Sequence, residues 1–232
     1  MSIGHASDKG VKPINQDFSG SSIPNEPLLS SKGIVLAMAD GISSSQVSQI
    51  ASQTAVSGFL EDYYCTSDSW SVKTSVQKVV KSINSWLCAQ TCNSPYRFER
   101  DKGYICTFSA LVLKSNTAHL FHSGDTRIYR LSGNSLEPLT KDHRRVVSPE
   151  VSYLTRALGI EQSFEIDYQT QPIEQGDVFV LATDGVYEFI DTVQIVEAIH
   201  HAKSLDCAAT RIIQQALDAG SDDNLSVQVV RT

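Results

Sequence analysis

Two near-continuous apolar segments, each ending close to an Asp-Gly pair, constrain the fold of this chain more than any other feature. They read "VLAMADG" at residues 35 to 41 and "VFVLATDG" at residues 178 to 185. A strand buried on both faces is apolar along its length, so both segments are predicted to be central strands of packed sheets. A single Asp-Gly pair is most simply a turn. Two such pairs suggest that the carboxylates converge, which a bound cation would make tolerable.

The remaining elements come in blocks of strands and blocks of helices rather than in regular alternation, which argues against a parallel βαβ protein. Ser43 to Ser45 are expected to cap the first helix, Gly124 to interrupt a strand, and residues 132–135 to form a hairpin turn. The predicted elements are a loop at 19–33, strands at 33–39, 105–113, 118–131 and 225–230, and helices at 47–58 and 72–87, from Asp191 and from near Asp206. This order favours two stacked sheets with helices outside, in one domain.

Composition narrows the classes of partner. The chain has 26 acidic and 19 basic residues, a net charge of −7, which argues against nucleic acid or an anionic membrane as the main partner. Neither a membrane-spanning segment nor a signal peptide is recognisable. The five cysteines form no CxxC pair, so we expect reduced thiols and a cytoplasmic protein.

Acidic residues beside small or turn-forming residues recur near predicted strand ends. These residues are Asp17, Asp40, Asp125, Asp184 and Asp223. Their spread along the chain is what a site assembled from several strand ends requires. Hard divalent cations prefer carboxylate oxygens, and no set of histidines and cysteines competes for the role. Each aspartate alone is more simply a turn residue or a helix cap, so the prediction of a metal site depends on the whole set.

A series of short motifs carries a family resemblance from about Asp8 to Val230. In order, they are "SDKGVKPINQD", "MADGI", "SGDTRIYR", "LTKDH", "LTRALG", "LATDGVYE" and "DDNLSV". The series resembles the metal-dependent serine/threonine protein phosphatases of type 2C, in their bacterial form. The resemblance implies an α+β fold, an α-β-β-α sandwich of two mainly antiparallel sheets flanked by helices. It also implies a single catalytic domain over residues 1–232.

The resemblance implies two tightly bound Mn²⁺ or Mg²⁺ ions. Asp17 is expected to bridge them. Asp40 and the backbone carbonyl of Gly41 would hold one ion, and Asp184 and Asp223 the other. Asp125 would bind a third, weaker ion. The catalytic candidates are therefore Asp17, Asp184 and Asp125.

Phosphate contacts are expected from two basic residues. Lys12 stands where the family usually has a phosphate-binding arginine, and its point charge would bind phosphate less well. Residues 142–155 match a shortened form of the flap that covers the site in bacterial relatives. Arg144 in this flap is a candidate for the substrate phosphate, although a solvated pair of Arg144 and Arg145 is the simpler interpretation. His143 is predicted to be an ordinary loop histidine. The short flap indicates an open site that discriminates little between peptides.

The implied activity is hydrolysis of phosphoserine and phosphothreonine in proteins by a metal-activated water. Its setting would be bacterial signalling that opposes a serine/threonine kinase, and a monomer is expected. One alternative is a catalytically weak regulatory or binding module of the same fold. Another is a two-metal hydrolase of small phosphoesters. The chain is also expected to be the excised catalytic domain of a longer protein.

Overall fold

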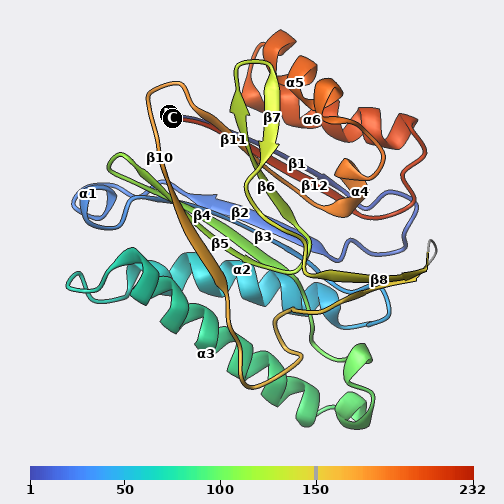
Figure 1. The fold of residues 1–232 in the computed structure, drawn as a ribbon. Coiled ribbons are helices and arrows are strands. Elements are labelled where there is room, and N and C mark those ends of the chain that lie inside the picture. The colour runs from blue at the N-terminus through green and yellow to red at the C-terminus, as the bar shows by residue number, and fades with distance from the viewer. Residues whose placement is uncertain (149–150) are drawn as a thin grey trace.

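Two five-stranded sheets pack face to face, and helices cover the outer face of each (Figure 1). The computed structural model describes residues 1–148 and 151–232. The first sheet contains, in spatial order, β1 (Ser2–Asp8), β12 (Leu225–Arg231), β11 (Val178–Ala182), β6 (Arg127–Ser132) and β7 (Ser135–Pro138). The second contains β10 (Asp167–Pro172), β5 (Thr117–Ser123), β4 (Phe108–Lys114), β3 (Ile34–Asp40) and β2 (Asp17–Ser22). The described strand pairs are antiparallel, so the expected α+β sandwich is confirmed.

Two helices cover each sheet. On the second sheet they are α2 (Ser48–Tyr64) and α3 (Val72–Cys92), and on the first they are α5 (Thr192–His201) and α6 (Leu205–Asp218). Shorter elements are α1 (Leu28–Lys32), α4 (Asp184–Tyr187), two 3₁₀ turns (Pro95–Phe98 and Arg100–Lys102) and the hairpin of β8 (Arg144–Ser148) and β9 (Val151–Leu154). No helix in residues 1–148 and 151–232 is long and apolar enough to cross a membrane.

The central strands are apolar throughout because they lie between two cores. In β3, Leu36 and Met38 face the first sheet, whereas Val35 and Ala37 face helices α2 and α3. The strand β11 repeats this alternation, with Phe179 between the sheets and its neighbours against α5 and α6. Burial on both faces leaves only the strand ends for polar groups, as the sequence predicted.

Some local expectations are confirmed. Helix α5 begins after Asp191, whose side chain accepts a hydrogen bond from the backbone N–H of Gln194 in a complete capping box. Helix α6 begins after Ser204, close to the expected position. Residues 132–135 form the turn between β6 and β7. Gly124 lies between β5 and β6 with a φ of 117°, which favours glycine.

Two local expectations are wrong. The segment 19–33 is not simply a loop, because its first residues complete β2 and Leu28–Lys32 form α1. The sequence "DFSGSS" of β2 lacks apolar alternation, since the strand lies at a sheet edge. Helix α2 is not capped by Ser43 to Ser45; its N-cap is Val47, which makes no side-chain cap hydrogen bond.

Candidate active site

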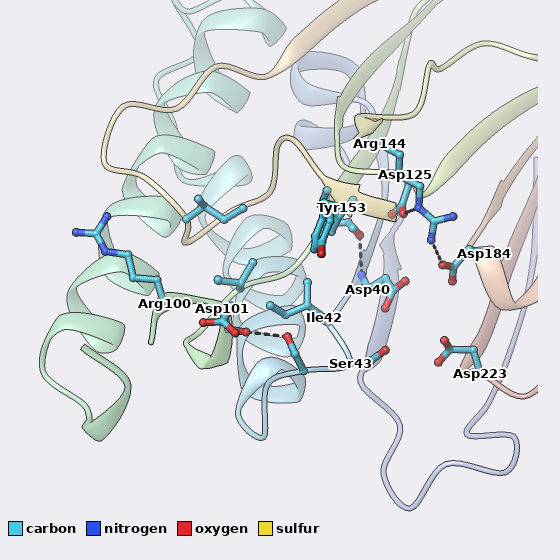
Figure 2. Close-up of a pocket in the computed structure, with 16 residues that line it drawn as sticks. Asp40, Ile42, Ser43, Arg100, Asp101, Asp125, Arg144, Tyr153, Asp184 and Asp223 are labelled. Atoms are coloured by element: carbon cyan, nitrogen blue, oxygen red, sulfur yellow. Dashed lines mark hydrogen bonds and ion pairs between the residues drawn. The ribbon is translucent and has the colours of Figure 1, made fainter. Parts of the chain in front are cut away.

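Several strand ends bring the predicted aspartates together at one edge of the sandwich. Asp17 begins β2 and lies directly opposite Asp40, which ends β3. Asp184 begins α4 just after β11, and Asp223 lies two residues before β12. Asp125 lies in the turn between β5 and β6. Figure 2 shows Asp40, Asp125, Asp184 and Asp223 at one end of a cleft of about 380 Å³, which all four help to line.

Burial and mutual repulsion disfavour the charged form of these carboxyl groups. Burial raises the pKa of Asp17 to about 6. The pKa of Asp40 lies well above its ordinary value, because of burial first and then the charges of Asp17, Asp184 and Asp125. Burial, followed by the charge of Asp125, raises the pKa of Asp184 to about 7, although Arg144 opposes the shift. The described residues of the site therefore carry fewer positive charges than are needed to balance its carboxylates.

The donor set fits divalent cations in its chemistry. Among the described residues, the Oδ1 atom of Asp17 is buried without a hydrogen-bond partner, and its Oδ2 accepts a hydrogen bond from the Thr183 hydroxyl at 3.0 Å. An unpartnered buried carboxylate oxygen is the kind of ligand that Mg²⁺ and Mn²⁺ prefer. In the part of the chain that the structure describes, no three acidic, histidine or cysteine side chains already enclose a common metal position.

Arg144 supplies part of the missing positive charge from within the chain. From β8 it forms ion pairs with Asp125, Asp184 and Glu188. Figure 2 shows the guanidinium between Asp125 and Asp184. Its neighbour Arg145 is exposed. The two arginines are therefore not a solvated pair, because only Arg145 faces solvent.

Lys12 lies at the edge of the carboxylate group rather than in the cleft. Its Nζ is 3.3 Å from the Oδ1 of Asp223, and both side chains are about one-third exposed. It borders a separate depression together with Gln16 and Ser45. The structure thus connects Lys12 to a predicted metal ligand, and its contact with substrate phosphate stays a prediction.

The glycines of the two Asp-Gly pairs are required by close packing. Neither Gly41 nor Gly185 has a positive φ, unlike the glycines of typical turns. A Cβ atom on Gly41 would lie 2.7 Å from the Cβ of Ser48, and one on Gly185 would lie 2.1 Å from the carbonyl oxygen of Asn224. The simple turn explanation is therefore wrong: these residues are small so that α2 and the start of β12 can approach the aspartates.

His143 has a structural role that the sequence did not reveal. Its backbone N–H donates to the carbonyl of Gly124 at 2.7 Å, and the Gly124 N–H donates to its Nδ1 at 3.1 Å. Because Nδ1 accepts, the ring proton lies on Nε2, 3.0 Å from the Oδ2 of Asp167. His143 thereby connects the start of the β8–β9 hairpin to the turn that carries Asp125. Its spacing in the sequence gives no signal for this contact.

The family follows from comparison with known proteins. The sequence profile described as Protein phosphatase 2C matches residues 14–225. The chain belongs to the protein phosphatase 2C family. The resemblance read from the motifs and the enzyme class, protein-serine/threonine phosphatase, are confirmed.

Two curated relatives of this chain come from bacteria. The serine/threonine phosphatase stp of Listeria welshimeri is 26% identical over 96% of this chain and 92% of its own length. The serine/threonine protein phosphatase PstP of Mycobacterium tuberculosis is 27% identical over 96% of this chain, which corresponds to 43% of that protein.

Solved structures of family members share the whole sandwich. The Mycobacterium tuberculosis phosphatase PstP/Ppp has a TM-score of 0.82 at 25% identity, with 98% of this chain and 96% of that chain covered. The catalytic domain of PstP in complex with two manganese ions has a TM-score of 0.79 at 25% identity, with the same coverage. A structure described as a bacterial serine phosphatase has a TM-score of 0.83 over 100% of this chain and 97% of that chain, and at 17% identity it supports the fold alone.

Proposed function

We propose that this protein phosphatase hydrolyses phosphoserine and phosphothreonine in proteins with the help of Mn²⁺ or Mg²⁺ held by the converging aspartates. The observation that carries the proposal is that four aspartates from distant parts of the chain line one end of a cleft, and that a fifth, Asp17, lies directly opposite one of them, Asp40. Burial and mutual repulsion raise the pKa of Asp17, Asp40 and Asp184 there. The manganese complex of PstP supports the choice of metal.

Two metal ions would use the ligands predicted from the motifs. Asp40 and the carbonyl of Gly41 would hold one ion, and Asp184 and Asp223 the other. Asp17 was predicted to bridge them. Asp40 lines the cleft together with Asp184 and Asp223, however, whereas Asp17 does not line it. We therefore propose Asp40 as the shared ligand and Asp17 as a further ligand through its unpartnered oxygen. When bound, such ions would lower the pKa of a water and offset charge on the phosphoryl oxygens.

The chain's own residues would orient the metal ions and the substrate. The Thr183 hydroxyl fixes one oxygen of Asp17, and the other oxygen has no hydrogen-bond partner among the described residues. Arg144 can donate to a phosphoryl oxygen in place of Asp184, because a guanidinium carries several N–H donors in one plane. Asp125 would hold the third, weaker ion, which would compete with Arg144 for the same carboxylate.

The cellular setting is proposed on chemical grounds. A phosphatase of phosphoserine and phosphothreonine requires a serine/threonine kinase to supply its substrates, so we propose a role opposing such a kinase. All five cysteines are free thiols, which supports a cytoplasmic protein. We also propose that the protein is a monomer and that residues 1–232 form a single catalytic domain. Residues 142–155 are proposed to form a short flap. Residues 149–150 of the flap lie outside the described part of the chain.

The test is turnover of a phosphothreonine peptide with Mn²⁺ and after removal of Mn²⁺ by a chelator. The proposal expects hydrolysis that depends on the metal and exceeds hydrolysis of nucleotides. Turnover of nucleotides but not peptides would favour a hydrolase of small phosphoesters. Absence of turnover on any phosphoester, with Mn²⁺ still raising the melting temperature, would favour a regulatory module.

A further inference from the structure

The cleft extends beyond the aspartates into an apolar half that no catalytic role explains. Its walls there include Ile42, Ile105, Tyr153, Leu154 and Ile160. Ile105 is buried, Ile42, Leu154 and Ile160 are partly exposed, and Tyr153 is 62% exposed at the rim. Figure 2 shows Ile42 and Tyr153 beside the aspartates and Arg100 at the opposite end. An apolar surface that is continuous with a reaction centre suits a ligand that extends beyond the reacting group.

Backbone pairing builds this apolar half. Gly41 pairs with Cys106, and Cys106 pairs with Leu158, in an antiparallel arrangement. The Cys106 and Leu158 backbones exchange two hydrogen bonds of 3.2 and 2.9 Å. Ile42 and Ile105 directly adjoin the paired Gly41 and Cys106, and both line the cleft. The pairing that positions Gly41 for catalysis therefore also places isoleucines next to it.

Serine hydroxyls hold the loop that carries Ile42. The Ser44 hydroxyl donates to the carbonyl of Asp101 at 2.8 Å, and the Ser45 hydroxyl donates to the carbonyl of Gly103 at 2.7 Å. These bonds attach the loop to the segment that leads to Ile105. The serines expected to cap α2 instead fix the wall of the cleft, so its apolar half is preformed.

The opposite wall comes from the β8–β9 hairpin, the proposed flap. Tyr153 lies opposite Arg145 in the register of this hairpin, and Leu154 lies opposite Arg144, which pairs with the aspartates. The contact between His143 and Gly124 holds the base of the hairpin beside Asp125. One short hairpin thus contributes both a cation to the acidic half and apolar side chains to the other half.

We propose that the apolar half of the cleft is a substrate subsite that binds an apolar side chain adjoining the phosphorylated serine or threonine. This inference rests on the proposed function, and its occupant follows from continuity: a peptide whose phosphate lies at the aspartates has its neighbouring residue within the same cleft. The subsite revises the expectation, drawn from the short flap, that the site discriminates little between peptides. The selected substrates would carry a residue such as leucine next to the phosphate.

The experiment compares kcat/KM with Mn²⁺ on four substrates. These are a capped phosphothreonine, a glycine-flanked phosphothreonine peptide, and two versions of that peptide with leucine directly before or directly after the phosphothreonine. One leucine peptide is expected to exceed the glycine peptide by about tenfold, the lower end of what a hydrophobic pocket gives to a fitting group. Equal values for the glycine peptide and both leucine peptides would overturn the subsite.

Two variants locate the selectivity. The selectivity ratio is kcat/KM for the preferred leucine peptide divided by kcat/KM for capped phosphothreonine. Tyr153→Ala and Ile160→Ala are each expected to lower this ratio by about three- to tenfold. Tyr153→Phe should keep the ratio, because the apolar ring and not the hydroxyl makes the contact. Val193→Ala is the matched control, since Val193 is 58% exposed on α5 and does not line the cleft. Unchanged ratios in both alanine variants would overturn the proposal.

Failure of the subsite and failure of the proposed function give different results. If the function is wrong, the wild-type protein shows no Mn²⁺-dependent turnover on any of the four substrates. If only the subsite is wrong, all four are hydrolysed without preference for leucine, or the preference survives in both alanine variants.

Discussion

The two halves of the cleft differ in how the chain specifies them. The acidic half consists of aspartates at strand ends, most of them beside a small or turn-forming residue, and this pattern is visible in the sequence. The apolar half consists of isoleucines, a leucine and a tyrosine that come together only in the folded chain. A charged residue at the end of a buried strand is unusual, whereas an isoleucine is common in any core. Sequence therefore reveals the chemical end of such a site more readily than the end that would select substrates.

The largest effect is expected from a substitution in the acidic half. Asp40→Asn should lower kcat/KM on a phosphothreonine peptide by at least about 10³-fold, or ~4 kcal/mol, because it removes the carboxylate that we propose both ions share. It should also reduce the rise in melting temperature with Mn²⁺, since ligand binding stabilises the folded state. A Mn²⁺ titration followed by melting temperature and turnover checks both.

Asp17→Asn decides which aspartate is shared between the ions. If Asp40 is the shared ligand, Asp17→Asn should keep more of the Mn²⁺-dependent thermal shift than Asp40→Asn does. The reverse order would restore Asp17 to the bridging role predicted from the motifs.

A smaller effect is expected where the two halves join, at Arg144. Arg144→Ala should destabilise the metal-free protein by about 1–2 kcal/mol, less than a fully buried pair would give because the Arg144 side chain is 23% exposed. It should lower kcat/KM on a phosphopeptide by about tenfold, the loss expected when one charged hydrogen bond to substrate is removed. Arg145→Ala is the matched control, since Arg145 is exposed on the same strand.

The stability measurement also tests competition between Arg144 and metal. The destabilisation should shrink in saturating Mn²⁺, because a cation replaces the lost guanidinium beside Asp125. A deficit of equal size with and without Mn²⁺ would show that Arg144 and the metal act independently.

Whether a feature could be predicted from the sequence depended on its physical origin. The strands β3 and β11 were predictable because burial on both faces requires continuous apolar residues. The strand β2 was not, because an edge strand needs no such pattern. The contacts of Arg144 and His143 depend on where the β8–β9 hairpin lies, which nothing local specifies. The aspartates were recognised as a set, yet their individual charge environments required the structure.

The pH dependence of stability provides a weaker probe of the acidic half. Asp17 and Asp184 have folded-state pKa values of about 6 and about 7, above the unfolded value of about 3.9. A raised carboxyl pKa means that the folded state binds the proton more tightly. The stabilisation from these groups is therefore complete below about pH 4 and is lost as the pH rises through 6 to 7.

Melting temperatures measured in a chelator should accordingly fall between pH 5 and pH 8. In saturating Mn²⁺ they should rise over the same range, because the metal binds only deprotonated carboxylates. Asp40→Asn should flatten both trends. Parallel curves with chelator and with Mn²⁺ would contradict a metal site at these aspartates.

The smallest effect is expected at Lys12, at the outer edge of the acidic half. If Lys12 contacts the substrate phosphate, Lys12→Arg should lower KM for a phosphopeptide while kcat changes by no more than a few-fold, as for a ground-state contact. Its Nζ lies 3.3 Å from Asp223, however, so Lys12 has a second possible role through that ligand. In that case Lys12→Ala should change the Mn²⁺ concentration needed for half-maximal activity and leave KM unaltered. Measuring both quantities in both variants separates the roles, and no change in either quantity would remove Lys12 from the site.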